Sequence, residues 1–155
     1  MSGCFSCERN AGDPEQLPQR ERVYDDGLWR VAHALSSSLA GWMCAITRRH
    51  LTSISELSPA EASALGPILQ RLSAALEATT GATKCYVLFF AEAPGFEHLH
   101  IHLVPRLKDL SPERTGPGVI AYLNEPPERW IPATEMDSIS GKITEAMERQ
   151  RKEQT

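Results

Sequence analysis

Three histidines alternate with aliphatic residues in one short segment, and no other stretch constrains the fold as strongly. Residues 98–104 read His-Leu-His-Ile-His-Leu-Val. Successive side chains of a β-strand point to opposite faces, so an extended chain would bury Leu99, Ile101 and Leu103 and gather the three imidazoles on the other face. Neighbouring imidazoles would then lie about 6.6 Å apart, because a strand rises ~3.3 Å per residue. A helix would scatter the rings around its axis.

A row of histidines suits particular chemistry. Imidazole titrates near neutral pH, can attack phosphorus or carbonyl carbon, and is the commonest metal ligand. The chain has only five histidines, and His98, His100 and His102 are three of them. The row therefore predicts a catalytic site or a metal site that uses all three imidazoles, with a His-rich polar strand face as the plainer alternative.

The segment resembles the signature of the histidine triad (HIT) family, which is His-x-His-x-His followed by two apolar residues, x being apolar. Residues 98–104 match it in full, and a looser resemblance extends over 25–106. The resemblance implies an α+β fold, in which an antiparallel sheet carries a long helix on one face and a C-terminal helix follows. We expect a single HIT-like domain over 1–155, with a Cys-containing N-terminal segment (1–24), a HIT core (25–106) and a C-terminal tail with a helix (107–155).

The amino-terminal cysteines predict a metal site. Cys4 and Cys7 have the spacing of a zinc knuckle but supply only two ligands, and the other two cysteines are isolated. Resemblance to the zinc-containing branch of the HIT family implies that His50 and His98 complete the set. One structural Zn²⁺ per chain would then pin the amino terminus against the sheet. The alternative is a disordered end with two idle thiols.

The resemblance also implies a reaction. His100 would attack the α-phosphorus of a dinucleoside polyphosphate or nucleoside phosphoramidate, and water would release a nucleoside monophosphate from the nucleotidyl-histidine. A neutral imidazole is a competent nucleophile at pH 7. The carbonyl of His98 is implied to fix the tautomer of His100, and His102 to donate to a phosphate oxygen. Many HIT hydrolases carry Gln, Ser or Thr just before the triad, where this chain has Phe96 and Glu97. A nucleotide-binding module with negligible turnover therefore stays open as an alternative.

Three further residues are candidates for nucleotide binding. His33 lies in an expected strand where the resemblance implies a contact to the ribose, and it could equally be a structural histidine. Trp42 begins the next strand and could stack on a base or belong to the core. Arg106 follows the triad and could meet a distal phosphate or stay an exposed cation.

Sequence patterns predict the element order β-β-α-β-β followed by a tail. Alternation over 28–35 and 42–47 indicates a hairpin, and residues 84–91 are β-branched and aromatic, typical of a strand that pairs antiparallel with the triad strand. Residues 8–22 are polar and predict an irregular connection.

Two helices carry clear signals. The first begins at Ser58 with a proline next and Glu61 three positions on, and it ends at Gly81. Its apolar residues follow the 3,4-spacing of a core-facing side, and Pro67 should kink it. The last helix begins at Thr134 and carries a similar stripe.

Composition limits the remaining possibilities. With 41% hydrophobic and 23% charged residues, 155 residues suit one soluble core, and no apolar run approaches the roughly 20 residues of a membrane span. The first residues lack the parts of a secretory signal, which predicts a cytoplasmic protein. A net charge of −4 argues against general nucleic-acid binding. The HIT resemblance implies a homodimer, with the apolar segment 119–123 as a candidate contact.

Overall fold

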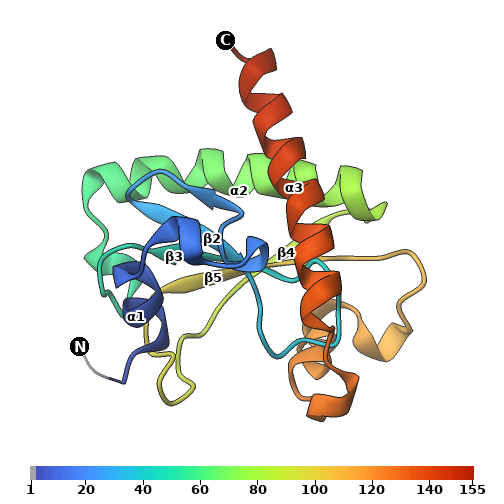
Figure 1. The fold of residues 1–155 in the computed structure, drawn as a ribbon. Helices are drawn as coiled ribbons and strands as arrows, with labels where there is room; N and C mark the ends of the chain where they lie inside the picture. The colour runs from blue at the N-terminus through green and yellow to red at the C-terminus, as the bar shows by residue number, and fades with distance from the viewer. Residues whose placement is uncertain (1–2) are drawn as a thin grey trace.

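The structure, a computed structural model, describes residues 3–155. Its centre is an open five-stranded sheet of order β1-β2-β3-β5-β4 in which every neighbouring pair is antiparallel (Figure 1). This confirms the α+β fold, the hairpin, and the pairing of the 84–91 segment with the triad strand. The strands are β1 (Tyr24–Asp25), β2 (Trp29–His33), β3 (Met43–Thr47), β4 (Cys85–Phe89) and β5 (His100–Pro105).

Helix α2 (Pro59–Thr80) begins and ends as its sequence predicts. The Ser58 side chain accepts the backbone N–H of Glu61, and the Glu61 carboxylate accepts the N–H of Ser58, so two otherwise unpaired donors are satisfied. Gly81 ends the helix at φ 72°, a left-handed conformation that glycine adopts without a Cβ clash. The helix runs as one element through Pro67.

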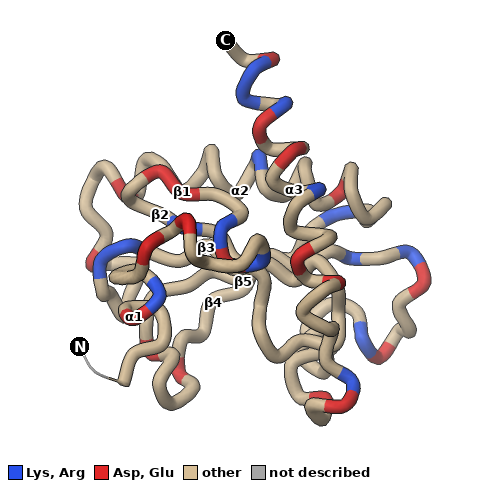
Figure 2. The backbone as a smooth tube through the Cα atoms, in the orientation of Figure 1, with Lys and Arg blue, Asp and Glu red and all other residues tan. Residues whose placement is uncertain are grey.

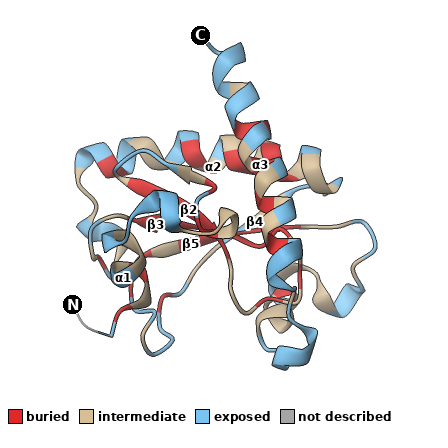
Figure 3. Ribbon diagram, in the orientation of Figure 1, coloured by how far each residue is buried: buried red, intermediate tan, exposed pale blue. Residues whose placement is uncertain are grey.

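Helices α2 and α3 (Ala133–Glu153) pack on the same face of the sheet and form the main core (Figures 1 and 3). The expected C-terminal helix is thus confirmed. Leu72 of α2 and Ile143 of α3 are fully buried against Trp29, whose indole N–H donates to the carbonyl of Glu61. Burying one such aliphatic side chain contributes roughly 1.5–3 kcal/mol.

The opposite face of the sheet is only partly covered. A second apolar cluster there joins Trp42, Cys44 and Val104 to Val119 of the 3₁₀ helix η5 (Gly116–Leu123). Residues 119–123 therefore pack on the sheet of their own chain, with Val119 fully buried. The uncovered part of this face holds the cavity described below.

The amino-terminal region is more regular than its polar sequence predicts. Residues Phe5–Ala11 form helix α1, followed by the 3₁₀ turns η1 (Pro14–Gln16) and η2 (Gln19–Glu21). A seven-residue helix is marginal alone, so tertiary contacts must hold it. The Asn10 amide supplies one by donating to the carbonyls of Thr47 and Arg48 at the end of β3. The prediction of an irregular segment over 8–22 was wrong because local sequence does not show this docking.

Short 3₁₀ helices connect the other elements: η3 (Ile54–Glu56), η4 (Pro112–Arg114) and η6 (Pro127–Arg129). Basic and acidic residues are interleaved along the chain, notably in the last turns of α3 (Figure 2). Across residues 3–155, no helix combines the length and apolar character needed to cross a bilayer.

Candidate functional site

The three histidines separate into two environments. Leu99, Ile101 and Leu103 are buried as the alternation predicts. His98, however, precedes β5 in a bend and is fully buried, whereas His100 and His102 lie on the strand and line a cavity. The expectation that residues 98–104 are one strand with three imidazoles in one solvent-facing pocket was therefore wrong for His98. The two remaining rings tilt toward each other in a T-shape, with centroids 4.8 Å apart rather than the expected spacing.

The tautomer of His100 follows from one hydrogen bond. Its Nδ1 lies 2.7 Å from the carbonyl oxygen of His98, and a carbonyl can only accept. Nδ1 therefore carries the proton, and Nε2 keeps a free lone pair. Burial lowers the pKa of His100, which favours the neutral ring at pH 7.

His102 has the opposite arrangement. Its Nδ1 accepts the indole N–H of Trp42 at 2.9 Å, and an indole can only donate. The neutral ring therefore carries its proton on Nε2. Burial and the neighbouring His100 lower the pKa of His102 to about 4. Two adjacent imidazoles thus differ at Nε2, where His100 has a lone pair and His102 an N–H.

The cavity over these rings has a volume of about 390 Å³, enough for a small ligand. Strands β2, β3 and β5 form its floor, and the loop after β4, helix α1 and the end of η5 form its walls. Phe90 and Phe96 lie on the wall and are 51% and 40% exposed. Leu123 and Asn124 of the same chain line it too, so the C-terminal tail completes its own cavity.

The structure brings one of the three expected nucleotide contacts to the cavity. His33 lines it, but both ring nitrogens are engaged, since Nδ1 lies 2.8 Å from the Ala34 carbonyl and Nε2 accepts the Gly41 N–H. Trp42 is fully buried and its indole orients His102. Arg106 donates to backbone carbonyls just beyond β5, and among the described residues neither it nor Trp42 lines the cavity.

The loop before the triad offers one carboxylate to the cavity. Glu97 accepts the backbone N–H of Gly95 at 2.8 Å and so stabilises the turn. Glu92 is exposed and lines the cavity. Of these two carboxylates, Glu92 is the one placed to meet a ligand.

Four side chains from distant parts of the sequence form a cluster that could bind one metal ion: Cys4, Cys7, His50 and His98. Cys7 Sγ lies 3.3 Å from His50 Nδ1 and 3.5 Å from His98 Nδ1, and Cys4 Sγ lies 3.5 Å from His98 Nδ1. Tetrahedral zinc with usual bond lengths would separate a sulfur and a nitrogen ligand by about 3.6 Å. The donor set and its spacing therefore fit Zn²⁺, as the resemblance to the zinc-containing branch of the HIT family implies.

His98 connects this cluster to the cavity. Its Nε2 donates to the carbonyl of Thr47 at 2.7 Å, which leaves Nδ1 free to bind a metal, and its own carbonyl accepts from His100. A metal held here would be structural, tying α1 to the sheet. Because His98 turns toward the cysteines, the arrangement does not favour a metal site made of all three triad histidines.

Several cavity residues were not singled out from the sequence, among them Arg30, Glu21 and Phe5. For Arg30 a signal existed, because Trp29 and Val31 face the core and alternation places Arg30 on the opposite face. For Glu21 and Phe5 there was none, since loop docking brings them in.

The fold and site define an α+β protein whose sheet carries, on its open face, a cavity with a histidine pair of opposite tautomers, next to a Cys–His cluster that could bind a metal. The family model described as HIT domain matches residues 16–109, more than half of the chain, and the chain belongs to the HIT family. Membership in the HIT family implies nucleotide binding with hydrolase or transferase activity.

Solved structures agree on the fold. A Zn-bound histidine triad family protein from Mycobacterium smegmatis is 17% identical, covers 96% of each chain and gives a TM-score of 0.70. A hypothetical histidine triad nucleotide-binding protein from Sulfolobus tokodaii is also 17% identical, covering 94% of this chain and 93% of its own, with a TM-score of 0.70. A uridylyltransferase, 18% identical, covers 94% of this chain and 45% of its own at 0.65. No curated protein matches in sequence.

Proposed function

We propose that this protein is a nucleotide hydrolase that works through a covalent nucleotidyl-histidine on His100. The supporting observation is the complementary pair of Nε2 atoms in the cavity. His100 offers a lone pair to phosphorus because His98 takes its Nδ1–H, and His102 offers an N–H to a phosphate oxygen because Trp42 occupies its Nδ1.

The reaction has two displacements. In the first, the lone pair of His100 Nε2 forms a bond to the α-phosphorus while the bond to the leaving group breaks, and the leaving group takes a proton from solvent. In the second, water attacks the same phosphorus and loses a proton to solvent, the N–P bond breaks so that Nε2 regains its lone pair, and the nucleoside monophosphate leaves. The substrate class is a dinucleoside polyphosphate or nucleoside phosphoramidate.

A His100→Asn variant tests the proposal. It should still bind a nucleoside monophosphate and melt near the wild-type temperature, yet release no nucleoside monophosphate from adenosine or guanosine phosphoramidates and dinucleoside polyphosphates. Activity equal to that of wild type would refute the nucleophile.

A nucleotide-binding module with negligible turnover is the second candidate. One observation favours it: Glu97, the last residue before the triad, is hydrogen-bonded to its own turn and is not free to protonate a leaving group. Calorimetry with AMP and GMP, combined with a turnover assay, separates the two candidates. A binding module would bind these nucleotides but would release no nucleoside monophosphate from the substrates.

We also propose a homodimer in a reducing, cytoplasmic compartment. Strand β4 forms one edge of the sheet, and Val87 at its centre is 50% exposed, which suits pairing with another chain. Sedimentation of wild type and a Val87→Lys variant tests the dimer. A monomeric wild type would refute it.

A further inference from the structure

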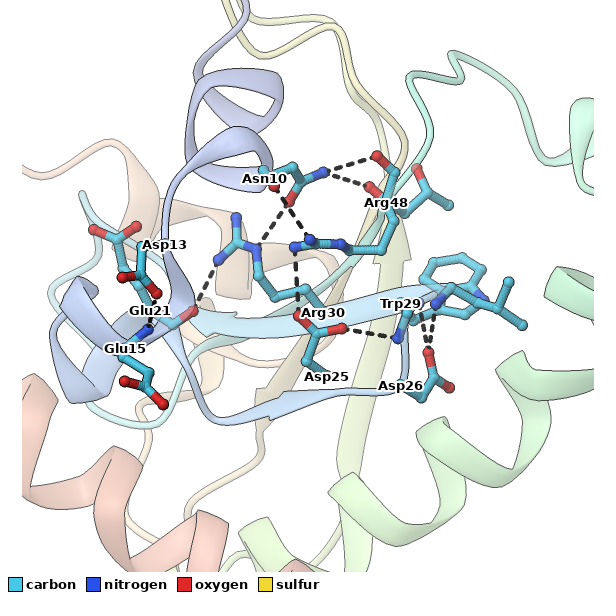
Figure 4. Close-up of polar contacts among 12 residues, drawn as sticks. Asn10, Asp13, Glu15, Glu21, Asp25, Asp26, Trp29, Arg30 and Arg48 are labelled. Carbon is cyan, nitrogen blue, oxygen red and sulfur yellow. Dashed lines mark hydrogen bonds and ion pairs between the residues drawn. The ribbon is translucent and has the colours of Figure 1, made fainter.

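A buried arginine in the cavity wall lacks one of its hydrogen-bond partners. Arg30 on β2 is 2% exposed. Its Nε donates to Asn10 Oδ1 at 3.0 Å and its Nη1 to the Glu21 carbonyl at 2.9 Å, whereas Nη2 is buried without a partner (Figure 4). Arginine is seldom buried unless its donors are satisfied, so this nitrogen is a donor in need of an acceptor.

A carboxylate oxygen without a hydrogen bond lies in the same region. Glu21 is 3% exposed, and its Oε2 is buried without a hydrogen bond. The same Oε2 forms an ion pair with Arg9 Nε at 3.3 Å. The Arg9 side chain is 43% exposed, and its guanidinium lies over the Phe5 ring at 5.1 Å, so only this surface ion pair has to open for Oε2 to meet a ligand. Glu21 and Arg30 both line the cavity, beside Ser6 of α1.

The strand register fixes where this pair lies relative to the histidines. Arg30 pairs with Ile46, and Ile46 pairs with His100. Arg30 is therefore two strands from His100 in the same row of the sheet, about 9.6 Å between backbones. A nucleotide whose phosphorus meets His100 can reach that far with the edge of its base.

We propose that Arg30 and Glu21 form a base-recognition subsite for a lactam edge, a carbonyl oxygen beside a ring N–H, as in guanine and hypoxanthine. Arg30 Nη2 donates to the carbonyl oxygen, and Glu21 Oε2 accepts the ring N–H after Arg9 shifts. The subsite rests on the proposed nucleotide function, and it adds a preference for the base of the nucleotide.

The lactam edge suits this pair better than the edge of adenine. A guanidinium bonds more strongly to a carbonyl oxygen with two lone pairs than to a ring nitrogen with one, and a carboxylate accepts best from an acidic ring N–H. A neutral base also satisfies both buried groups without adding charge to the wall.

Calorimetry on the wild-type protein with GMP, IMP, AMP and purine riboside monophosphate tests the subsite. None of these nucleoside monophosphates has a leaving group on its α-phosphorus for the enzyme to displace, so calorimetry measures binding alone. We expect GMP and IMP to bind at least tenfold more tightly than AMP, and purine riboside monophosphate, which lacks the lactam, to bind like AMP or more weakly. Equal affinities, or tighter AMP binding, would overturn the subsite and leave the proposed hydrolase intact. No binding of any of the four would overturn both.

Variants assign the preference to the pair. Arg30→Met and Glu21→Gln should bring GMP affinity to the level of AMP while changing AMP affinity less than about threefold. Arg22→Met is the matched control, because Arg22 adjoins Glu21 in sequence but is exposed and lies outside the cavity. A GMP preference that survives Arg30→Met would overturn the assignment. The wild-type series decides the base preference even if a variant fails to fold.

Discussion

Burial of His102 should make the protein lose stability as the pH falls from 7 to 5. The buried ring has its pKa lowered to about 4, against about 6.5 in an unfolded chain. Protonating Nδ1 would also place its N–H against the indole N–H of Trp42, and the existing hydrogen bond would be lost. Because the folded-state pKa is lowered, the contribution is present above the unfolded pKa and is lost as the pH falls toward the folded pKa.

The size of the effect follows from these two pKa values. At pH 7 His102 is mostly unprotonated in both the folded and the unfolded protein, so its titration changes the free energy of unfolding little. At pH 5 the unfolded chain binds a proton at His102 and the folded protein does not, which costs about 2 kcal/mol of the free energy of unfolding. That is a large share of the 5–15 kcal/mol typical of a domain.

Urea unfolding at pH 7, 6 and 5 measures this in wild type and in His102→Gln, in matched zinc-saturated samples. Glutamine does not titrate, and its carbonyl can still accept from Trp42. Zinc release and the other histidines affect both proteins alike, so the difference between the two pH profiles isolates His102. Wild type should lose about 2 kcal/mol more than the variant between pH 7 and 5. Parallel profiles would refute the argument that His102 is held neutral by its surroundings.

Three further predictions follow from single contacts. Trp42→Phe removes the shorter of two contacts to His102 Nδ1 and leaves the Cys44 thiol at 3.4 Å as the other. We expect kcat to fall by about tenfold, for ~1–1.5 kcal/mol of lost hydrogen bonding, and ¹⁵N NMR to show a mixture of His102 tautomers in place of Nε2–H. An unchanged tautomer would contradict the role of the indole. Gly66→Ala puts a Cβ on an exposed turn of α2 that meets no atom within 4 Å apart from its chain neighbours, but the ring of Pro67 crowds the Cβ of a helical residue before it. Urea unfolding should therefore show less than the ~1 kcal/mol gain of an ordinary glycine-to-alanine change in a helix, and a gain of the full size would contradict this crowding. Cys7→Ser should lower bound zinc from one per chain and speed amide exchange in α1 ahead of α2, whereas full zinc retention would contradict the Cys–His cluster.

Much of this fold follows from local sequence. Alternation alone separates Leu99, Ile101 and Leu103 from His100 and His102, and the capping residues set the ends of α2 within one position. The spacing of Cys4 and Cys7 indicates two metal ligands, but His50 and His98 could be expected to join them only through the family resemblance, because nothing in the local sequence brings them to the cysteines.

What the sequence missed depends on tertiary contacts. Alternation places His98 on the same side as its partners, but the bend before β5 turns it toward the cysteines. Helix α1 forms through docking on β3 rather than through its own propensity. The role of Trp42 depends on a hydrogen bond across the sheet, and a tryptophan in a strand is read first as core or as a stacking surface.

Mass spectrometry of the protein after brief exposure to nucleotide substrates tests the central claim most directly. We expect a nucleotidyl adduct on the peptide that contains His100, trapped by rapid acid-free quenching and absent from His100→Asn. Turnover without that adduct, or an adduct on another residue, would contradict it.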